Sequence, residues 1–286
     1  MNDYLLSVIL GIVEGLTEFL PVSSTAHLRV TEALLGIDLS SGYWKMYTIV
    51  IQLGAIVCLP IYFRDRIAKF LRTFPNGEDG DKNVFTHPVT LVIIGSAVTA
   101  IPSLLLLKII GKNLENLYVI AWSLIVGGIV MWLVDLYFGA AERARTESME
   151  RMSLAQAVWI GACQILSAVF PGTSRSMATI AGGQIVGLTR SAALEFSFFL
   201  SMPIMVAATG LELTKTLLGK HHDAMSPVAM SPHQWILLAI GFVVSFVVAY
   251  AVVAWFMRWV RSRGFVPFAV YRILAGAAVL FWAMRS

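Results

Sequence analysis

The strongest constraint on this chain is a series of apolar runs, each close to the length that crosses a lipid bilayer. A spanning helix needs about 20 predominantly apolar residues. The runs of about this length cover residues 43–63, 89–107, 118–138, 192–213, 235–257 and 265–284. Charged residues make up only 13% of the chain, against about 25% in ordinary soluble domains. The sequence therefore predicts an all-α, polytopic membrane protein with six spans.

Two further apolar segments, residues 2–36 and 153–188, are broken in the middle by Pro21 and by Pro171-Gly172. Each half of these segments is too short to cross a bilayer alone. Irregular backbone at membrane depth is tolerated only where it lines a cavity enclosed by protein. Each segment is therefore predicted to be a re-entrant helical hairpin.

The distribution of Lys and Arg predicts the orientation. Of the 21 basic residues, twelve fall on one side of the predicted spans and seven on the other. The richer side is expected to be cytoplasmic. Both termini and the entry of the first hairpin then lie outside, and the second hairpin enters from the cytoplasm. The net charge of +4 is accordingly explained by the membrane topology and by contact with anionic lipids, and it is not taken as a sign of nucleic-acid binding.

The two broken segments match each other at an offset of about 150 residues. The matched pairs include Gly11 with Gly161, Pro21 with Pro171, and Ser24 with Ser174. Each half then contains one hairpin and three spans, and an odd number of spans places the second half upside down. The sequence predicts an inverted-topology repeat, with halves of about 1–140 and 151–286 in a single membrane domain, 1–286. Chance similarity of apolar sequence is the alternative, and the shared Pro and Ser at both breaks argue against it.

Hydroxyl residues follow each break, where a second half-helix would begin. They are Ser23, Ser24 and Thr25 in the first hairpin and Thr173, Ser174 and Ser176 in the second. Ser and Thr are favoured helix N-caps, and a helix N-terminus attracts anions, phosphate above all. Arg175 adds a side chain suited to binding phosphate through two hydrogen bonds. The tips are thus predicted to form a phosphate site.

Acidic and basic groups divide unequally between the halves. Glu14 and Glu18 are four residues apart and share a helix face, so a divalent cation, Mg²⁺ or Ca²⁺, is predicted to bridge them to phosphate. Ion pairs with Arg29 or Lys45 are the alternative. His27 shares the face of Ser24 and is a candidate general base or nucleophile, or else a packed polar group.

The motifs EGLTEFLPVSSTAH (residues 14–27) and PGTSRSMAT (residues 171–179) resemble those of the undecaprenyl-diphosphate phosphatase family, also called bacitracin-resistance proteins. The stretches VIQLGAI, EFSFFLSMP and FVPFAVYR extend the resemblance over essentially the whole chain. Met177 and Ala26 depart from the family pattern, which usually has Gly at both places. The side chain of Met177 is expected to narrow the pocket near His27.

The resemblance implies a multi-pass enzyme of the bacterial cytoplasmic (inner) membrane. Its expected reaction converts the C55 isoprenoid diphosphate to the monophosphate and inorganic phosphate. This recycles the lipid carrier of peptidoglycan synthesis and lowers the target available to bacitracin. The resemblance also implies a homodimer, and it assigns function to a set of residues in the two motifs: Glu14, Glu18, Ser24, His27, Ser174, Arg175 and Thr179.

For the mechanism, Ser24 is expected to attack the terminal phosphorus with His27 as base, on the outer face of the membrane. Arg175 and the tip residues are expected to bind the phosphate oxygens. A phosphohistidine formed on His27 is the reverse assignment. Arg272, in the last span, either reaches the outer phosphate or pairs with Glu195. Because inverted repeats with broken helices also build transporters, flipping of a lipid phosphate is the alternative function.

Overall fold

The computed structural model describes residues 2–37, 42–106, 110, 116–139, 144–217 and 231–285. These residues form α-helices and one 3₁₀ turn, and their only β-type pairing is an isolated bridge between Thr146 and Leu188. The elements are α1 (Asp3–Thr17), α2 (Ser24–Leu34), α3 (Gly42–Tyr62), α4 (Arg64–Thr73), α5 (Pro88–Leu105), α7 (Leu117–Phe138), η2 (Met149–Arg151), α8 (Leu154–Val169), α9 (Arg175–Ile185), α10 (Arg190–Leu217), α11 (Pro232–Ser262) and α12 (Val266–Ala283). The predicted all-α class is confirmed.

Five helices in the described part of the chain are long and apolar enough to cross a membrane: α5, α7, α10, α11 and α12. The bent pair formed by α3 and α4, which meet at 62°, counts as a sixth candidate span if the two helices are taken as one span. Each corresponds to a predicted span, and the protein is a multi-pass membrane protein. Residues from Arg64 onward, which follow the first predicted span (43–63), are predicted to form a loop. They form α4 instead, which buries Phe70 and leaves most of its charged residues exposed.

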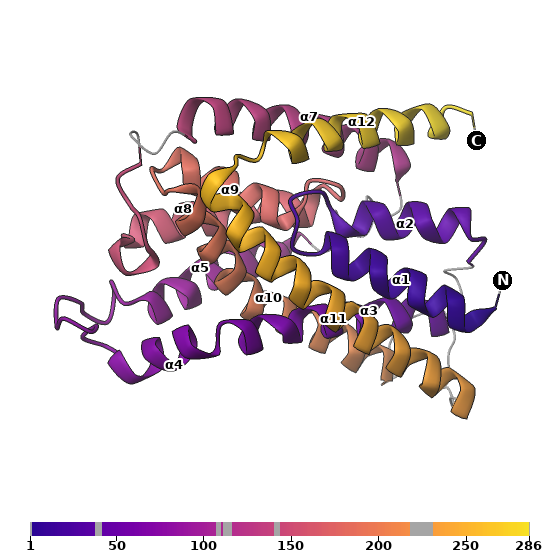
Figure 1. Cartoon of the computed structure of the whole chain (residues 1–286), viewed down its shortest axis with the longest axis horizontal. Coiled ribbons are helices and arrows are strands. Elements are labelled where there is room, and N and C mark those ends of the chain that lie inside the picture. Colours follow the sequence, from indigo (N-terminus) through magenta and orange to yellow (C-terminus); the bar gives the residue numbers. More distant parts are fainter. Residues whose placement is uncertain are drawn as a thin grey trace.

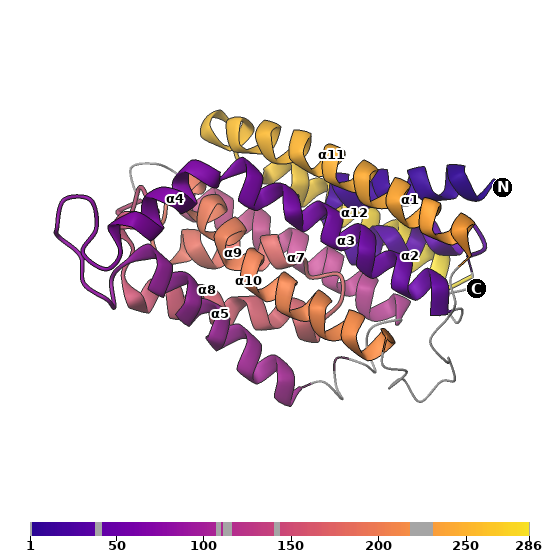
Figure 2. The same ribbon diagram turned by 90° about the horizontal axis from the view of Figure 1, so that it is seen from below.

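The helices run mainly along the long axis of the molecule (Figures 1 and 2). Both chain termini lie at one end, and α4 with the loop that follows it lies at the other. Helices α7 and α12 pack side by side, and α11 packs against both α1 and α3. The predicted orientation requires the basic segment that begins with α4 to lie at the end opposite the two termini, as it does here.

The two broken segments are helix–turn–helix hairpins, α1–α2 and α8–α9. In Figure 1, α1 runs from the N-terminal end toward the middle of the molecule, and α2 turns back. Ser23 caps α2 and Ser174 caps α9, each through a hydrogen bond from the backbone N–H three residues later. Their φ values of +75° and +70° are the only positive ones among described residues other than glycine. Such strained positions are characteristic of functional sites.

The caps correct the predicted alignment of the two tips. Ser174 is equivalent to Ser23, and not to Ser24, because one additional residue follows the proline in the second hairpin. The sequence offset of 150 therefore becomes 151 beyond the tip. Ser24 and Arg175 are the first residues of α2 and α9, so the candidate nucleophile of one hairpin occupies the position of the arginine in the other.

Matched glycine contacts join each hairpin to a span of the other half. A methyl group placed at Gly11 would lie 3.0 Å from the Gly241 carbonyl oxygen, and one at Gly161 would lie 2.4 Å from the Gly95 carbonyl oxygen. Thus α1 crosses α11 closely, and α8 crosses α5 closely. This is the pattern that an internal repeat predicts, while the inverted placement of the halves in a membrane stays a prediction.

Candidate active site

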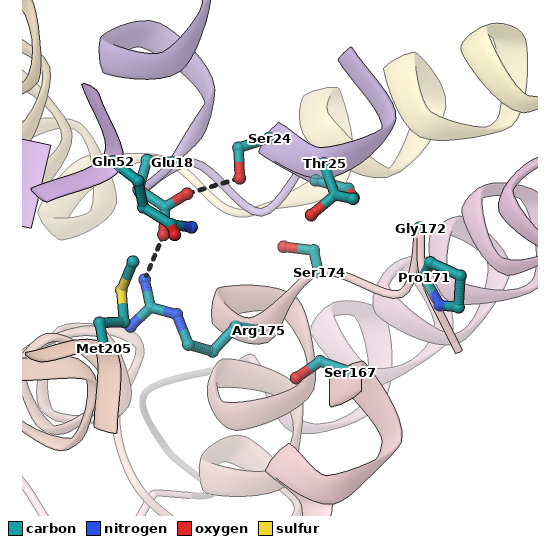
Figure 3. A pocket seen from close by; sticks show the side chains of 11 residues that line it. Glu18, Ser24, Thr25, Gln52, Ser167, Pro171, Gly172, Ser174, Arg175 and Met205 are labelled. Atoms are coloured by element: carbon teal, nitrogen blue, oxygen red, sulfur yellow. Dashed lines mark hydrogen bonds and ion pairs between the residues drawn. The ribbon is translucent and has the colours of Figure 1, made fainter. Parts of the chain in front are cut away.

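A cavity of about 150 Å³ lies between the two hairpin tips (Figure 3). The first hairpin contributes Glu18, Ser23, Ser24 and Thr25 to its lining, and the second contributes Ser167, Pro171, Gly172, Ser174 and Arg175. Gln52 of α3 and Met205 of α10 complete the lining. The fold therefore brings together the two motifs that the sequence analysis selected, although about 150 residues separate them.

Glu18 joins the two hairpins. Its Oε2 accepts a hydrogen bond of 2.5 Å from Ser24 Oγ, and its Oε1 accepts one of 3.3 Å from Arg175 Nη2. The Glu18 and Arg175 side chains are 4% and 14% exposed, so solvent screens this ion pair weakly. Figure 3 shows the carboxylate between the serine and the guanidinium. One carboxylate therefore contacts both the candidate nucleophile and the candidate phosphate ligand.

Glu14 is fully buried, and neither of its carboxylate oxygens has a hydrogen-bond partner. Arg29, one predicted partner, instead lies 3.4 Å from Glu32; the side chain of Lys45, the other, lies outside the description. A buried carboxylate without partners fits a cation ligand. Because the described residues hold no cluster of three or more His, Cys, Asp or Glu side chains, phosphate and water oxygens would have to complete the coordination, as is usual for Mg²⁺.

Both ring nitrogens of His27 form hydrogen bonds to groups other than the Ser24 hydroxyl. Its Nδ1 lies 2.7 Å from the Ser23 carbonyl oxygen, and its Nε2 lies 2.6 Å from the Tyr271 hydroxyl. A carbonyl oxygen only accepts, so Nδ1 carries the proton and, in the neutral ring, Nε2 accepts from Tyr271. The two rings stack with centroids 5.6 Å apart. His27 thus makes neither the predicted bond to Ser24 nor part of the cavity lining.

The predicted phosphate ligands fall into two groups. Ser23, Thr25, Ser174 and Arg175 line the cavity. The other three, Thr173, Ser176 and Thr179, do not. The Ser176 hydroxyl donates to the Leu20 carbonyl at 3.0 Å, and that of Thr179 lies 2.6 Å from the Ser197 hydroxyl. These two hydroxyls connect the second tip to neighbouring elements.

Sequence reasoning missed Gln52, Ser167 and Met205 in the cavity lining, and Tyr271 beside His27. Gln52 carried a usable signal, because it is a polar residue within a predicted span. Tyr271 carried none, since aromatic residues are common throughout the apolar runs. The predicted choices for Arg272 need a correction: Glu195 binds Arg66 at 2.8 Å, and Arg272 binds backbone carbonyls instead.

Two helix N-termini, the Arg175 guanidinium and the Glu18 carboxylate meet at this cavity, and the buried Glu14 lies one helical turn before Glu18 on α1. The fold and the site together define a multi-pass membrane protein with a polar cavity between two helical hairpins, whose chemistry suits an anion such as phosphate. The family model described as Bacitracin resistance protein BacA matches residues 7–278. The chain belongs to this family.

Curated relatives match over essentially their full length. An undecaprenyl-diphosphatase of Koribacter versatilis is 63% identical over 289 aligned residues, covering 100% of both chains. An undecaprenyl-diphosphatase of Caldanaerobacter subterraneus is 40% identical and covers 96% of this chain and 93% of its own. A third, from Novosphingobium aromaticivorans, is also 40% identical, with 100% coverage of both chains.

Proposed function

We propose that this protein hydrolyses undecaprenyl diphosphate to undecaprenyl phosphate and inorganic phosphate, recycles the lipid carrier of peptidoglycan synthesis and thereby confers bacitracin resistance. The full-length relatives that carry this activity in their names support the substrate. The observation that carries the chemistry is the bond between Ser24 and Glu18, beside Arg175, in a cavity large enough for a phosphate group.

In the proposed reaction, Ser24 Oγ attacks the terminal phosphorus and its proton passes to Glu18. The bond between that phosphorus and the bridging oxygen breaks, and undecaprenyl phosphate leaves. Water then hydrolyses the phosphoserine and releases inorganic phosphate. Geometry favours Glu18 over His27 as the base, because only Glu18 is bonded to Ser24 in this structure. His27 is the candidate for moving a proton to or from the cavity edge, through Nε2 once Tyr271 releases it.

Charge stabilisation falls to the second hairpin and the helix N-termini. Arg175 lines the cavity and α2 and α9 both begin beside it, so the guanidinium and the N-terminal N–H groups of these helices would bind the phosphate oxygens. A divalent cation, Mg²⁺ or Ca²⁺, held by Glu14 and Glu18 would neutralise phosphate charge. The proposed phosphate-binding groups are Ser23, Thr25, Ser174 and Arg175.

The predicted orientation is retained as part of this proposal. The site then opens to the outer (periplasmic) face of the bacterial cytoplasmic membrane, surrounded by membrane lipids, and the protein acts as a possible homodimer. The support is the placement of the termini at the end opposite α4, together with the excess of basic residues on the α4 side.

The test is phosphate release by purified Ser24→Ala on undecaprenyl diphosphate. We expect a loss of about 10³-fold or more, by analogy with removal of an activated serine. Ser96→Ala is the matched control, since Ser96 lies in a span and its one hydrogen bond among the described residues goes to the Val92 carbonyl of its own helix. If Ser24→Ala works as fast as wild type, the serine mechanism is wrong. Lipid transfer without any phosphate release by wild type would support the flippase alternative instead.

A further inference from the structure

Arg272 is the largest fully buried side chain in the described part of the molecule, with 0% exposure. It lies on α12, and its guanidinium donates only to backbone carbonyls. Nη1 binds the Pro21 oxygen at 3.1 Å, and Nη2 binds the oxygens of Gly172 at 3.0 Å and Ser123 at 3.1 Å. Pro21 and Gly172 are the breaks of the two hairpins. One planar group therefore contacts both tips and α7.

No ion pair among the described residues includes Arg272. A buried cation at membrane depth is costly, so a role is expected for it. Each hairpin break interrupts the helical hydrogen-bond ladder and leaves carbonyl groups that no helix can satisfy. Arg272 satisfies one such carbonyl at each tip. Its fixed fork of donors suits this task, whereas a lysine ammonium is a single point donor on a flexible stem.

We propose that Arg272 is a positioning residue that holds the two hairpin tips in register. By fixing Pro21 and Gly172 to one group, it keeps Ser24 of the first hairpin and Arg175 of the second around the shared carboxylate of Glu18. It does not itself bind the substrate phosphate, because both Nη atoms are engaged and Arg272 does not line the cavity. This inference rests on the proposed site, and its test measures the order of the two hairpin tips separately from the rate of phosphate release.

Gly127 of α7 offers a way to disturb Arg272 without removing it. A methyl group at Gly127 would lie within 2.3 Å of Arg272 Nη2 and 2.8 Å of Met177 Cε. Both atoms are the ends of flexible side chains, so they can move while the backbone stays in place. Gly127→Ala is therefore expected to fold and to push the guanidinium away from Gly172 and Ser123.

Gly210→Ala is the matched control, because it changes a helical glycine of α10 where an added methyl meets nothing within 4 Å. Arg272→Lys is the second variant, which keeps the charge and loses the fork. Hydrogen exchange measured by mass spectrometry on purified protein follows residues 19–26 and 170–177. Phosphate release on undecaprenyl diphosphate gives kcat and KM for the same samples.

We expect Gly127→Ala and Arg272→Lys to exchange roughly tenfold faster at both tips, with other helices unchanged. Their kcat should fall about tenfold or more with a smaller change in KM, because a small displacement of the reacting groups lowers the rate of the chemical step strongly. The control should match wild type in both measurements. Unchanged exchange at either tip in both variants, or unchanged kcat in both, would overturn the proposal. If Ser24→Ala stays active while Gly127→Ala speeds exchange at both tips, the proposed serine mechanism is wrong and the positioning role of Arg272 is still supported.

Discussion

Ser24 Oγ lies 2.5 Å from Glu18 Oε2, across the break of the first hairpin. Glu18 is the C-cap of α1 and Ser24 is the first residue of α2, so the turn itself brings the two together. The same carboxylate reaches Arg175 on the second hairpin at 3.3 Å. The proposed nucleophile, base and phosphate ligand are thus linked by hydrogen bonds in the structure, an arrangement that favours reaction without a large rearrangement.

The first prediction separates the two glutamates. Glu18→Gln should lower kcat by about 10²- to 10⁴-fold, the range expected for loss of a general base. Glu14→Gln keeps the Ser24–Glu18 bond and should chiefly raise the concentration of Mg²⁺ or Ca²⁺ needed for half-maximal activity. Phosphate release measured over a metal titration distinguishes them: Glu14→Gln should recover most of its kcat at saturating metal, whereas Glu18→Gln, which loses the base as well as a metal ligand, should not. A Glu18→Gln protein with wild-type kcat would rule out Glu18 as the base.

The second prediction concerns the hydroxyl that holds His27. Tyr271→Phe removes the 2.6 Å bond to Nε2 and keeps the stacked ring. Without this bond the His27 ring is held less firmly, so kcat should fall roughly fivefold, the equivalent of about 1 kcal/mol. His27→Ala should cost far more, about 10²-fold or above, if His27 moves protons. Steady-state phosphate release compares the two. Equal damage by both variants would mean that Tyr271 takes part in the chemistry itself.

The third prediction tests the close crossing of α8 and α5. Gly161→Ala places a methyl 2.4 Å from the Gly95 carbonyl oxygen, a backbone atom that cannot turn aside. Overpacking of this kind costs about 1–3 kcal/mol or more. Gly11→Ala should cost less, because its nearest contact is 3.0 Å. Thermal unfolding in detergent gives the order, with Gly210→Ala as control. A Gly161→Ala protein as stable as that control would show that the crossing is looser than described.

The fourth prediction concerns pH and the ion pairs at the α4 end. Arg66 binds Glu150 at 2.5 Å and Glu195 at 2.8 Å. Burial disfavours the Glu150 carboxylate, but its hydrogen bonds with Arg66 outweigh burial and hold its pKa below the ordinary value of 4.5. The pair therefore stabilises the fold above about pH 4.5 and loses that contribution as the pH falls through the lowered pKa.

Glu150→Gln should accordingly unfold at a lower temperature than wild type at pH 7, by the equivalent of about 1–3 kcal/mol. The difference should shrink as the pH falls below 4.5. The matched control is Glu147→Gln, whose carboxylate is 71% exposed and 3.6 Å from Arg151, and such surface pairs contribute little. A constant difference between wild type and Glu150→Gln from pH 7 to pH 3 would contradict the assignment.

The sequence by itself determined the class of protein and the positions of its breaks. Apolar runs of spanning length leave few alternatives to transmembrane helices, because lipid cannot satisfy backbone groups. Pro21 and Pro171 mark the interruptions for the same reason. Glu18, His27 and Arg175 stood out because charged and titratable side chains are rare at membrane depth. Each of these signals is local, and each could be interpreted without knowing what lies nearby.

The tertiary structure alone decided which of these groups touch. Ser24 bonds Glu18 and not His27, His27 bonds Tyr271, and Arg272 binds carbonyls of both tips in place of Glu195. Tyr271 is 244 residues from His27, and the two tip carbonyls are 100 and 251 residues from Arg272, separations at which periodicity and motif spacing carry no information. Hydrogen bonds depend on distance and angle within a fraction of an ångström, and only the packing of the helices sets these.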